Sequence, residues 1–282
     1  MQEQHIVETA VGHLKVQVLG QGQPVVLWHS LFVDDRSWKR LVPLIQGGRQ
    51  LLIVTGPGHG NSTDPGRRYS SEECADAAIT ILDELGVQRP VDWVGNAWGG
   101  HVGVLAATRH PSRVRTLVML GSPIAALSPL ERARTYLLLG LYRASGPSPA
   151  VVNGTSKVLL SPRTRAGDAE AVDLVHDCLR RADRRMLRNA ITSVSLHRTD
   201  LSDPLRHVAQ PTLIITGADH HGFTPAQAQE ATRLLPSGGV AIVPDAAYLV
   251  PLEAPATTAQ LVADFWAAED AATVSERRPT VQ

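Results

Sequence analysis

The chain has 282 residues, of which 43% are hydrophobic and 19% are charged, and its 27 basic residues balance its 27 acidic ones. That length suits one large domain, or a domain with an insert, and supplies enough apolar side chains for a stable core. Because binding to nucleic acid or to an anionic membrane surface depends on clustered positive charge, the neutral balance argues against both as partners.

The cysteine content and the apolar pattern narrow the class of protein further. The two cysteines, Cys74 and Cys178, have no neighbouring Cys or His pattern, so neither a disulfide framework nor a zinc site is expected. The first twenty residues lack a basic segment followed by an apolar run, and no uncharged apolar stretch reaches about 18 residues. The sequence therefore predicts a cytoplasmic protein without a signal peptide or membrane span.

Short β-rich runs alternate with helical patterns in the first 123 residues, which is typical of an α/β sheet. A hairpin is expected around Val11-Gly12, and a helix over 70–87 starts with a capping box formed by Ser70 and Glu73. The other expected elements are strands at 24–30, 51–56, 91–95 and 116–123 and helices at 36–46 and 98–109.

The pattern changes after residue 123. Residues 124–208 contain helical patterns and no strong strand, and two strands then follow at 211–219 and 239–246. We expect a core formed by 1–123 and 209–268, with a helix over 254–267, and a helical insert at 124–208. The polar tail, 269–282, is expected to be disordered.

Four segments carry a family resemblance. Residues 28–38 (WHSLFVDDRSW) resemble an H-G-x-x-x-x-x-x-W oxyanion loop, and 55–62 (TGPGHGNS) resemble a D-x-P-G-x-G-x-S turn. Residues 95–100 (GNAWGG) resemble the G-x-S-x-G nucleophile elbow, and 243–255 (VPDAAYLVPLEAP) resemble a last strand with its histidine loop. In this order they resemble the α/β-hydrolase superfamily. The resemblance implies a mostly parallel, eight-stranded sheet with helices on both faces and makes 124–208 a cap inserted before the last two strands.

The resemblance also locates the positions of the catalytic triad. The nucleophile position holds Ala97, the histidine position holds Tyr248, and the acid position falls on His220, with Asp219 one residue earlier as the alternative acid. A methyl group cannot attack a carbonyl, and a tyrosine with a pKa of about 10 is a poor base. Without a triad, only about 10³–10⁴-fold catalysis over water typically remains, so serine-type hydrolysis is not expected.

Without the triad, the resemblance still implies an oxyanion hole and a pocket. The backbone N–H groups of Trp98 and of Leu31 or Phe32 would form the hole. We expect Tyr248, Asp219 and His220 to be the catalytic candidates. The expected pocket residues are His29, Phe32, Asp34, Asn96, Ala97 and Trp98.

Three functions remain open at this point. The chain is a cofactor-independent, non-hydrolytic enzyme of the lyase, isomerase, cyclase or dehydratase type, or a catalytically inactive ligand-binding or scaffold protein, or a serine hydrolase inactivated by substitution at Ala97. The first uses the oxyanion hole and polar pocket groups on a small organic carbonyl compound. The expected partner in all three is a small apolar molecule with a carbonyl or carboxyl group, with no metal and no cofactor. The sequence leaves a homo-oligomer open.

Overall fold

The computed structural model describes residues 2–276 and contains one eight-stranded sheet, in the order β1-β2-β4-β3-β5-β6-β7-β8. The strands are β1 (Gln2–Thr9), β2 (Gly12–Gly20), β3 (Gln23–Trp28), β4 (Arg49–Val54), β5 (Val91–Asn96), β6 (Val114–Leu120), β7 (Thr212–Gly217) and β8 (Gly238–Val243). The hairpin β1–β2 and the pair β2–β4 are antiparallel, and every pair from β4 to β8 is parallel. The predicted α/β fold is confirmed.

The helices include those expected over 70–87, 98–109 and 254–267, each of which begins within one residue of its expected start. They are α1 (Val42–Ile45), α2 (Ser71–Glu84), α3 (Trp98–Arg109), α4 (Pro129–Ser145), α5 (Pro149–Leu159), α6 (Pro162–Gly167), α7 (Ala169–Arg181), α8 (Arg184–Ala190), α9 (Ser202–Arg206), α10 (Pro225–Thr232), α11 (Val250–Glu253) and α12 (Pro255–Glu276). The predicted capping box of Ser70 and Glu73 starts α2. The single helix expected at 36–46 is instead a 3₁₀ turn, Asp35–Trp38, followed by the short α1.

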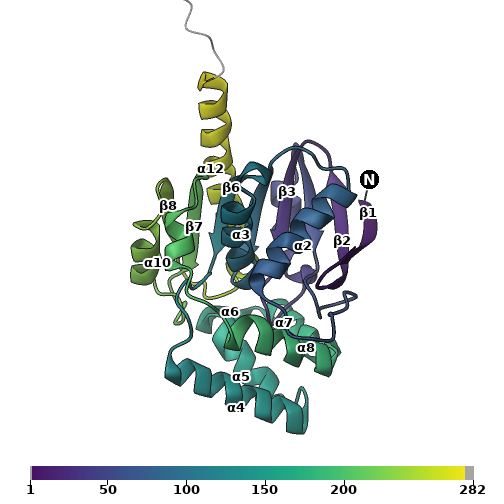
Figure 1. Ribbon diagram of the computed structural model, residues 1–282. Coiled ribbons are helices and arrows are strands. Elements are labelled where there is room, and N and C mark those ends of the chain that lie inside the picture. Colours follow the sequence, from purple (N-terminus) through teal and green to yellow (C-terminus); the bar gives the residue numbers. More distant parts are fainter. Residues whose placement is uncertain (1, 277–282) are drawn as a thin grey trace, which may run out of the picture.

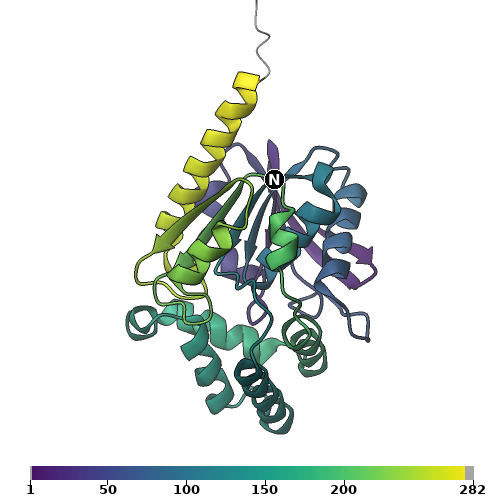
Figure 2. The same cartoon turned by 60° about the vertical axis from the view of Figure 1, so that its left-hand side comes forward.

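The sheet separates two apolar cores. Val26 and Trp28 of β3 pack on the side of α2 and α3, whereas Val25 and Leu27 pack on the other side with Trp266 of α12. Consecutive residues of a strand point to opposite faces, so a continuous apolar run is the pattern of a strand covered on both faces. The first two figures show the helices of both layers around the twisted sheet (Figure 1, Figure 2).

The chain between β6 and β7 is helical, as its sequence pattern predicted. The helices α4 to α8 lie together below the sheet in both views, with α4 and α5 farthest from it (Figure 1, Figure 2). Their position covers the end of the sheet at which the parallel strands finish. This is the edge where ligands bind in open α/β sheets.

The C-terminal helix is longer than expected. The sequence placed the end of that helix at 267 and a disordered tail at 269–282, but α12 continues to Glu276. The segment 267–272 contains four alanines, which favour helix, and this explains the difference for the described part. Residues 277–282 of the predicted tail lie outside the described residues. Across 2–276, no helix combines the length and the apolar character needed to cross a bilayer.

Candidate active site

The turn between β5 and α3 has the strained backbone of a nucleophile elbow, although its central residue is alanine. Ala97 has φ 50° and ψ −106°, and it is one of two non-glycine residues with positive φ among those described. The N–H of Ala97 donates to the Leu120 carbonyl at 2.8 Å. A Cβ on Gly95 would lie 2.1 Å from the Gly99 backbone, so only glycine allows the strand and helix to approach this closely.

Tyr248 and His220 lie in contact at the carboxyl ends of the neighbouring strands. Their ring centroids are 4.1 Å apart, with planes tilted by 34°. The Asn96 amide, at the end of β5, donates to the Tyr248 carbonyl at 3.0 Å and to the Leu120 carbonyl at 2.8 Å. The Asn96 amide thus anchors the Tyr248 backbone, while the His220 ring packs against the Tyr248 side chain. Burial raises the pKa of the Tyr248 phenol, which is therefore protonated at neutral pH.

The buried ring of His220 is a hydrogen-bond acceptor. Its Nδ1 accepts hydrogen bonds from the N–H groups of Gly222, at 3.1 Å, and Phe223, at 2.9 Å. The proton therefore lies on Nε2, which faces the Gly121 carbonyl at 3.3 Å. Burial lowers the pKa of His220 to about 4, so the ring is neutral.

Asp219 is the residue that the sequence offered as an alternative acid. Its backbone N–H donates to the Ala246 carbonyl at 2.9 Å, and its side chain makes no hydrogen bond or ion pair among the described residues. The structure brings His220, rather than Asp219, into contact with Tyr248. The loop has not shifted to place a carboxylate there.

The loop after β3 is held by two buried histidines. His29 donates from Nδ1 to the Ser30 carbonyl at 2.8 Å and accepts the Gly56 N–H at Nε2 at 2.9 Å. Burial lowers the pKa of His29 to about 4, with the neighbouring His59 adding to the shift. Nε2 of His59 lies 2.6 Å from the Leu31 carbonyl. These contacts fix the backbone of the predicted oxyanion loop.

A cavity of about 530 Å³ lies between this end of the sheet and the helices α4 and α5. From the sheet side it is bordered by Phe32, Pro123, His221, Gly222 and Tyr248. Its polar lining from the helical side consists of Glu131, Arg134, Thr135, Thr155, Lys157, Ser195 and Arg198. The volume is that of a site for a small organic molecule.

The comparison with known families fits this geometry. Residues 25–261 match the Alpha/beta hydrolase family. The chain belongs to that family. The match runs from β3 to α12 and includes the elbow, the helical segment and the Tyr248 loop.

Relatives within the alpha/beta hydrolase family have several activities in their names. A 2-hydroxy-6-oxononadienedioate/2-hydroxy-6-oxononatrienedioate hydrolase of Cupriavidus pinatubonensis is 29% identical over 72% of each chain. A putative 2-succinyl-6-hydroxy-2,4-cyclohexadiene-1-carboxylate synthase of Bacillus subtilis is 26% identical over 86% of this chain and 90% of its own. A thermophilic esterase from Thermogutta terrifontis superposes with a TM-score of 0.87 at 20% identity, over 95% of this chain and 99% of its own, which shows the shared fold.

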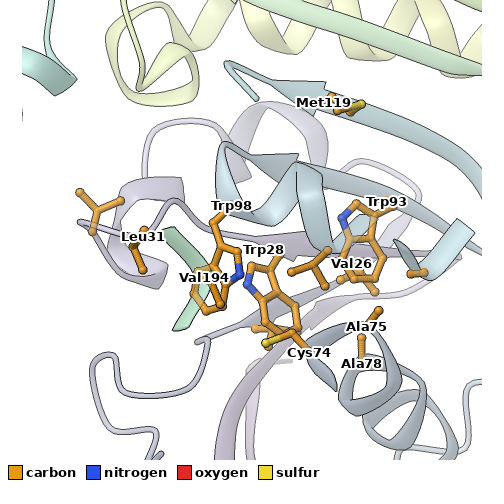
Figure 3. Close-up of a cluster of buried hydrophobic side chains, with 14 of the residues drawn as sticks. Val26, Trp28, Leu31, Cys74, Ala75, Ala78, Trp93, Trp98, Met119 and Val194 are labelled. Carbon is orange, nitrogen blue, oxygen red and sulfur yellow. The ribbon is translucent and has the colours of Figure 1, made fainter. Parts of the chain in front are cut away.

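The structure corrects the expected position of the Trp98 side chain. The sequence placed it at the pocket floor, but its ring packs edge-on against Trp28, with centroids 5.6 Å apart, and only 3% of the residue is exposed. Figure 3 shows the indole among Trp28, Leu31 and Val194. A Cβ on Gly56 would lie 2.6 Å from the ring, so the missing side chain at 56 makes room for it. Trp98 does not border the 530 Å³ cavity.

Three other expected pocket residues have structural contacts instead. His29 bridges two loops, and the side-chain amide of Asn96 donates hydrogen bonds to two backbone carbonyls. Asp34 caps the 3₁₀ turn by accepting the Arg36 N–H at 3.0 Å and pairs with the Arg36 guanidinium. All three are buried, and none borders the cavity. Of the expected pocket residues, only Phe32 lines it; Ala97 does not, and is 3% exposed.

The sequence pattern did not predict the cationic side chains that line the cavity. Arg134, Lys157 and Arg198 come from the helical segment, whose fold the local pattern did not reveal. A signal existed in the sequence, because 124–208 is rich in arginine, but no spacing rule selects these three. In the described part of the chain, no cluster of three or more His, Cys, Asp or Glu side chains is placed to hold a metal ion.

Proposed function

We propose that this chain is a non-hydrolytic, cofactor-independent enzyme of the lyase or isomerase type that acts on a small organic acid with a carbonyl group. The observation that carries the proposal is the strained elbow at Ala97, which persists without a nucleophile. Strain of this kind costs about 1–3 kcal/mol and is typical of functional sites. Its remaining use is to aim the first N–H groups of α3 at a substrate oxygen.

The backbone donors at the elbow suit an enolate, and they lie beyond the lining of the 530 Å³ cavity. The Trp98 N–H belongs to the first turn of α3, where no intrahelical acceptor exists, and the helix end adds partial positive charge. In this proposal, the N–H groups of Trp98 and Leu31 hold the carbonyl oxygen while the neutral Tyr248 phenol donates a proton or a hydrogen bond. Such preorganised donors stabilise charge that develops in the transition state.

A proton acceptor is also present. Glu131 borders the cavity, and although burial raises the pKa of its carboxyl group, hydrogen bonds from Ser128 and the charge of Arg198 bring it below the usual range. Oε2 of Glu131 accepts from Ser128, whereas Oε1 has no hydrogen bond among the described residues. We assign Glu131 the role of removing the proton next to the carbonyl group.

The names of relatives support this substrate class. The relative from Cupriavidus pinatubonensis is named as a hydrolase of an oxo dicarboxylic acid, and that from Bacillus subtilis as a putative synthase of a carboxylate. Both names describe small organic acids, and the second names no hydrolysis. Our proposal gives this chain the same kind of substrate with the non-hydrolytic outcome.

Ligand binding without catalysis is the second candidate. It is favoured by the burial of Ala97 and Trp98, neither of which borders the cavity. An otherwise normal serine hydrolase with one inactivating change is less well supported, because Tyr248 and His220 also differ from a histidine and a carboxylate. One restored serine would leave both differences in place.

The test is proton exchange at the carbon next to a carbonyl group. The protein is incubated in D₂O with 2-oxoadipate or 3-oxoadipate, and deuterium incorporation is followed by NMR. We expect catalysed exchange, slowed about 10²-fold or more in Tyr248→Phe. Tyr142→Phe is the matched control, since Tyr142 is a buried phenol outside the cavity. Exchange unaffected by Tyr248→Phe would remove Tyr248 from the mechanism, and binding without exchange would favour the second candidate.

A further inference from the structure

Arg198 is a half-buried cation without an anionic partner in contact. Its Nε is buried and has no hydrogen-bond partner, and within residues 2–276 its guanidinium forms no ion pair of 4 Å or less. Burial lowers the pKa of Arg198 from its ordinary value, which reflects the cost of removing the charge from water. A buried charge normally has a partner, so this one points to a ligand.

Two further cations line the same cavity. Arg134 of α4 and Lys157 of α5 are exposed at its rim, and neither forms an ion pair or a side-chain hydrogen bond in the described part of the chain. The one carboxylate in the lining, Glu131, accepts two hydrogen bonds from Ser128. Three cationic side chains and one carboxylate leave the lining with two net positive charges at neutral pH.

The charge pattern also distinguishes this cavity from its neighbours. Arg198 borders a second hollow of about 370 Å³, but there it faces the two carboxylates Glu131 and Glu230 and no other cation. A third hollow, next to α2, is lined by two cations, Arg68 and Arg198, and by two carboxylates, Glu72 and Glu73, so these charges cancel. Of these three hollows in the described part of the chain, the one that contains Tyr248 combines an excess of positive charge with the phenol.

From this arrangement we propose that the cavity binds a dicarboxylate, with one carboxylate on the inner guanidinium of Arg198 beside Tyr248 and the other between Arg134 and Lys157 at the rim. A guanidinium can donate two parallel hydrogen bonds to one carboxylate, which fixes its orientation. The proposal deepens the proposed function, on which its link to catalysis rests, by naming the charge of the substrate.

Binding can be tested without turnover by calorimetric titration with adipate, monomethyl adipate and dimethyl adipate, which carry two, one and no negative charges. We expect adipate to bind at least tenfold more tightly than the monoester and the diester not to bind. A series from succinate to suberate then gives the preferred chain length. Equal affinity for the three adipates, or no binding by any dicarboxylate in the series, would overturn the dicarboxylate site.

Variants test which side chains bind each of the two carboxylates of adipate. Arg198→Gln should weaken adipate binding at least tenfold, while Arg132→Gln, an exposed arginine of α4 outside the cavity, should leave it unchanged. If Arg198→Gln does not fold, Arg134→Gln and Lys157→Gln still test the rim, because each should reduce the preference for adipate over its monoester. Unchanged preference in both rim variants contradicts the proposal. Arg198-dependent binding without proton exchange would uphold the site and reject the proposed enzyme.

Discussion

Ala97 keeps a backbone conformation that alanine adopts only at a cost. Its φ of 50° with ψ of −106° lies outside the regions open to residues with a Cβ. The surroundings impose the conformation, since the strand end, the Leu120 carbonyl and the close Gly95–Gly99 contact leave the turn no alternative. The free energy stored in this single residue is measurable.

Ala97→Gly should therefore raise the free energy of unfolding by about 1 kcal/mol. Release of about 1–3 kcal/mol of strain outweighs the extra chain entropy of glycine, which is about 0.5–1 kcal/mol. Urea denaturation measures the difference. The control is Ala133→Gly at an exposed position of α4, which should lower stability by about 1 kcal/mol. A loss of stability in Ala97→Gly equal to that of the control would contradict strain at the elbow.

Restoring hydrolysis should need three substitutions rather than two. In Ala97→Ser with Tyr248→His, the new imidazole would meet His220, whose Nδ1 already accepts two backbone N–H groups and whose Nε2 carries a proton. Adding His220→Asp supplies the carboxylate that orients the imidazole. We expect hydrolysis of p-nitrophenyl acetate only in the triple variant. Comparable activity in the double variant would show that His220 can replace the acid.

Positions along the chain were predicted better than the directions of side chains. Motif spacing selected Ala97, Tyr248 and His220, because backbone turns tie residue types to fixed places. It did not predict that Trp98 turns into the core, since that depends on Gly56, which is far away in the sequence. Nor did it find Arg198, because a lack of partners can be seen only in three dimensions.

The strand ends are coupled by one amide. The Asn96 side chain at the end of β5 connects the carbonyl of Leu120, at the end of β6, with that of Tyr248, in the loop after β8. The Leu120 carbonyl also accepts from Ala97, whereas no other hydrogen bond to the Tyr248 carbonyl occurs among the described residues. The position of the Tyr248 loop therefore depends on Asn96.

Asn96→Ala should lower stability by about 1–3 kcal/mol and also weaken binding of adipate. The stability loss follows from a buried carbonyl left without a donor. Gln210→Ala is the matched control, because Gln210 is a buried amide that donates to the Pro111 carbonyl at 2.9 Å, away from the cavity. It should lose similar stability and keep adipate affinity. Equal effects of both variants on affinity would show that Asn96 does not position Tyr248.

Helices and strands were predicted correctly where a short stretch of sequence is enough to specify them. The capping box of α2 and the apolar strands β3 to β7 follow from short stretches of sequence, and these predictions were confirmed. The helix expected at 36–46 was wrong in its continuity, because Asp34 caps a separate 3₁₀ turn that ends before α1 begins at Val42. The arrangement of α4 to α8 depends on contacts between helices, which local periodicity does not encode.

Across the whole molecule, several histidines are buried in neutral form. Burial lowers the pKa of His29 and of His220 to about 4 and that of His101 to about 3. The three lie after β3, after β7 and in α3, around the strand ends that form the site. His101 places Nε2 2.7 Å from the Pro123 carbonyl. Each ring supports backbone around the cavity, so protonation of any one opposes the folded state.

Stability should therefore fall steeply as the pH drops from about 6.5 toward 4. In the unfolded chain these histidines have a pKa of about 6.5, so between 6.5 and 4 the unfolded state binds more protons than the folded state, and stability rises with pH. Each group contributes about 1.4 kcal/mol per pH unit there, or about 4 kcal/mol for three. Urea denaturation at pH 7.5, 6 and 5 measures this slope. His220→Asn, whose amide oxygen can accept the Gly222 and Phe223 N–H groups, should remove about a third of the part that these three histidines contribute. A free energy of unfolding that stays constant from pH 7 to 5 would mean that these histidines are hydrated in the folded protein.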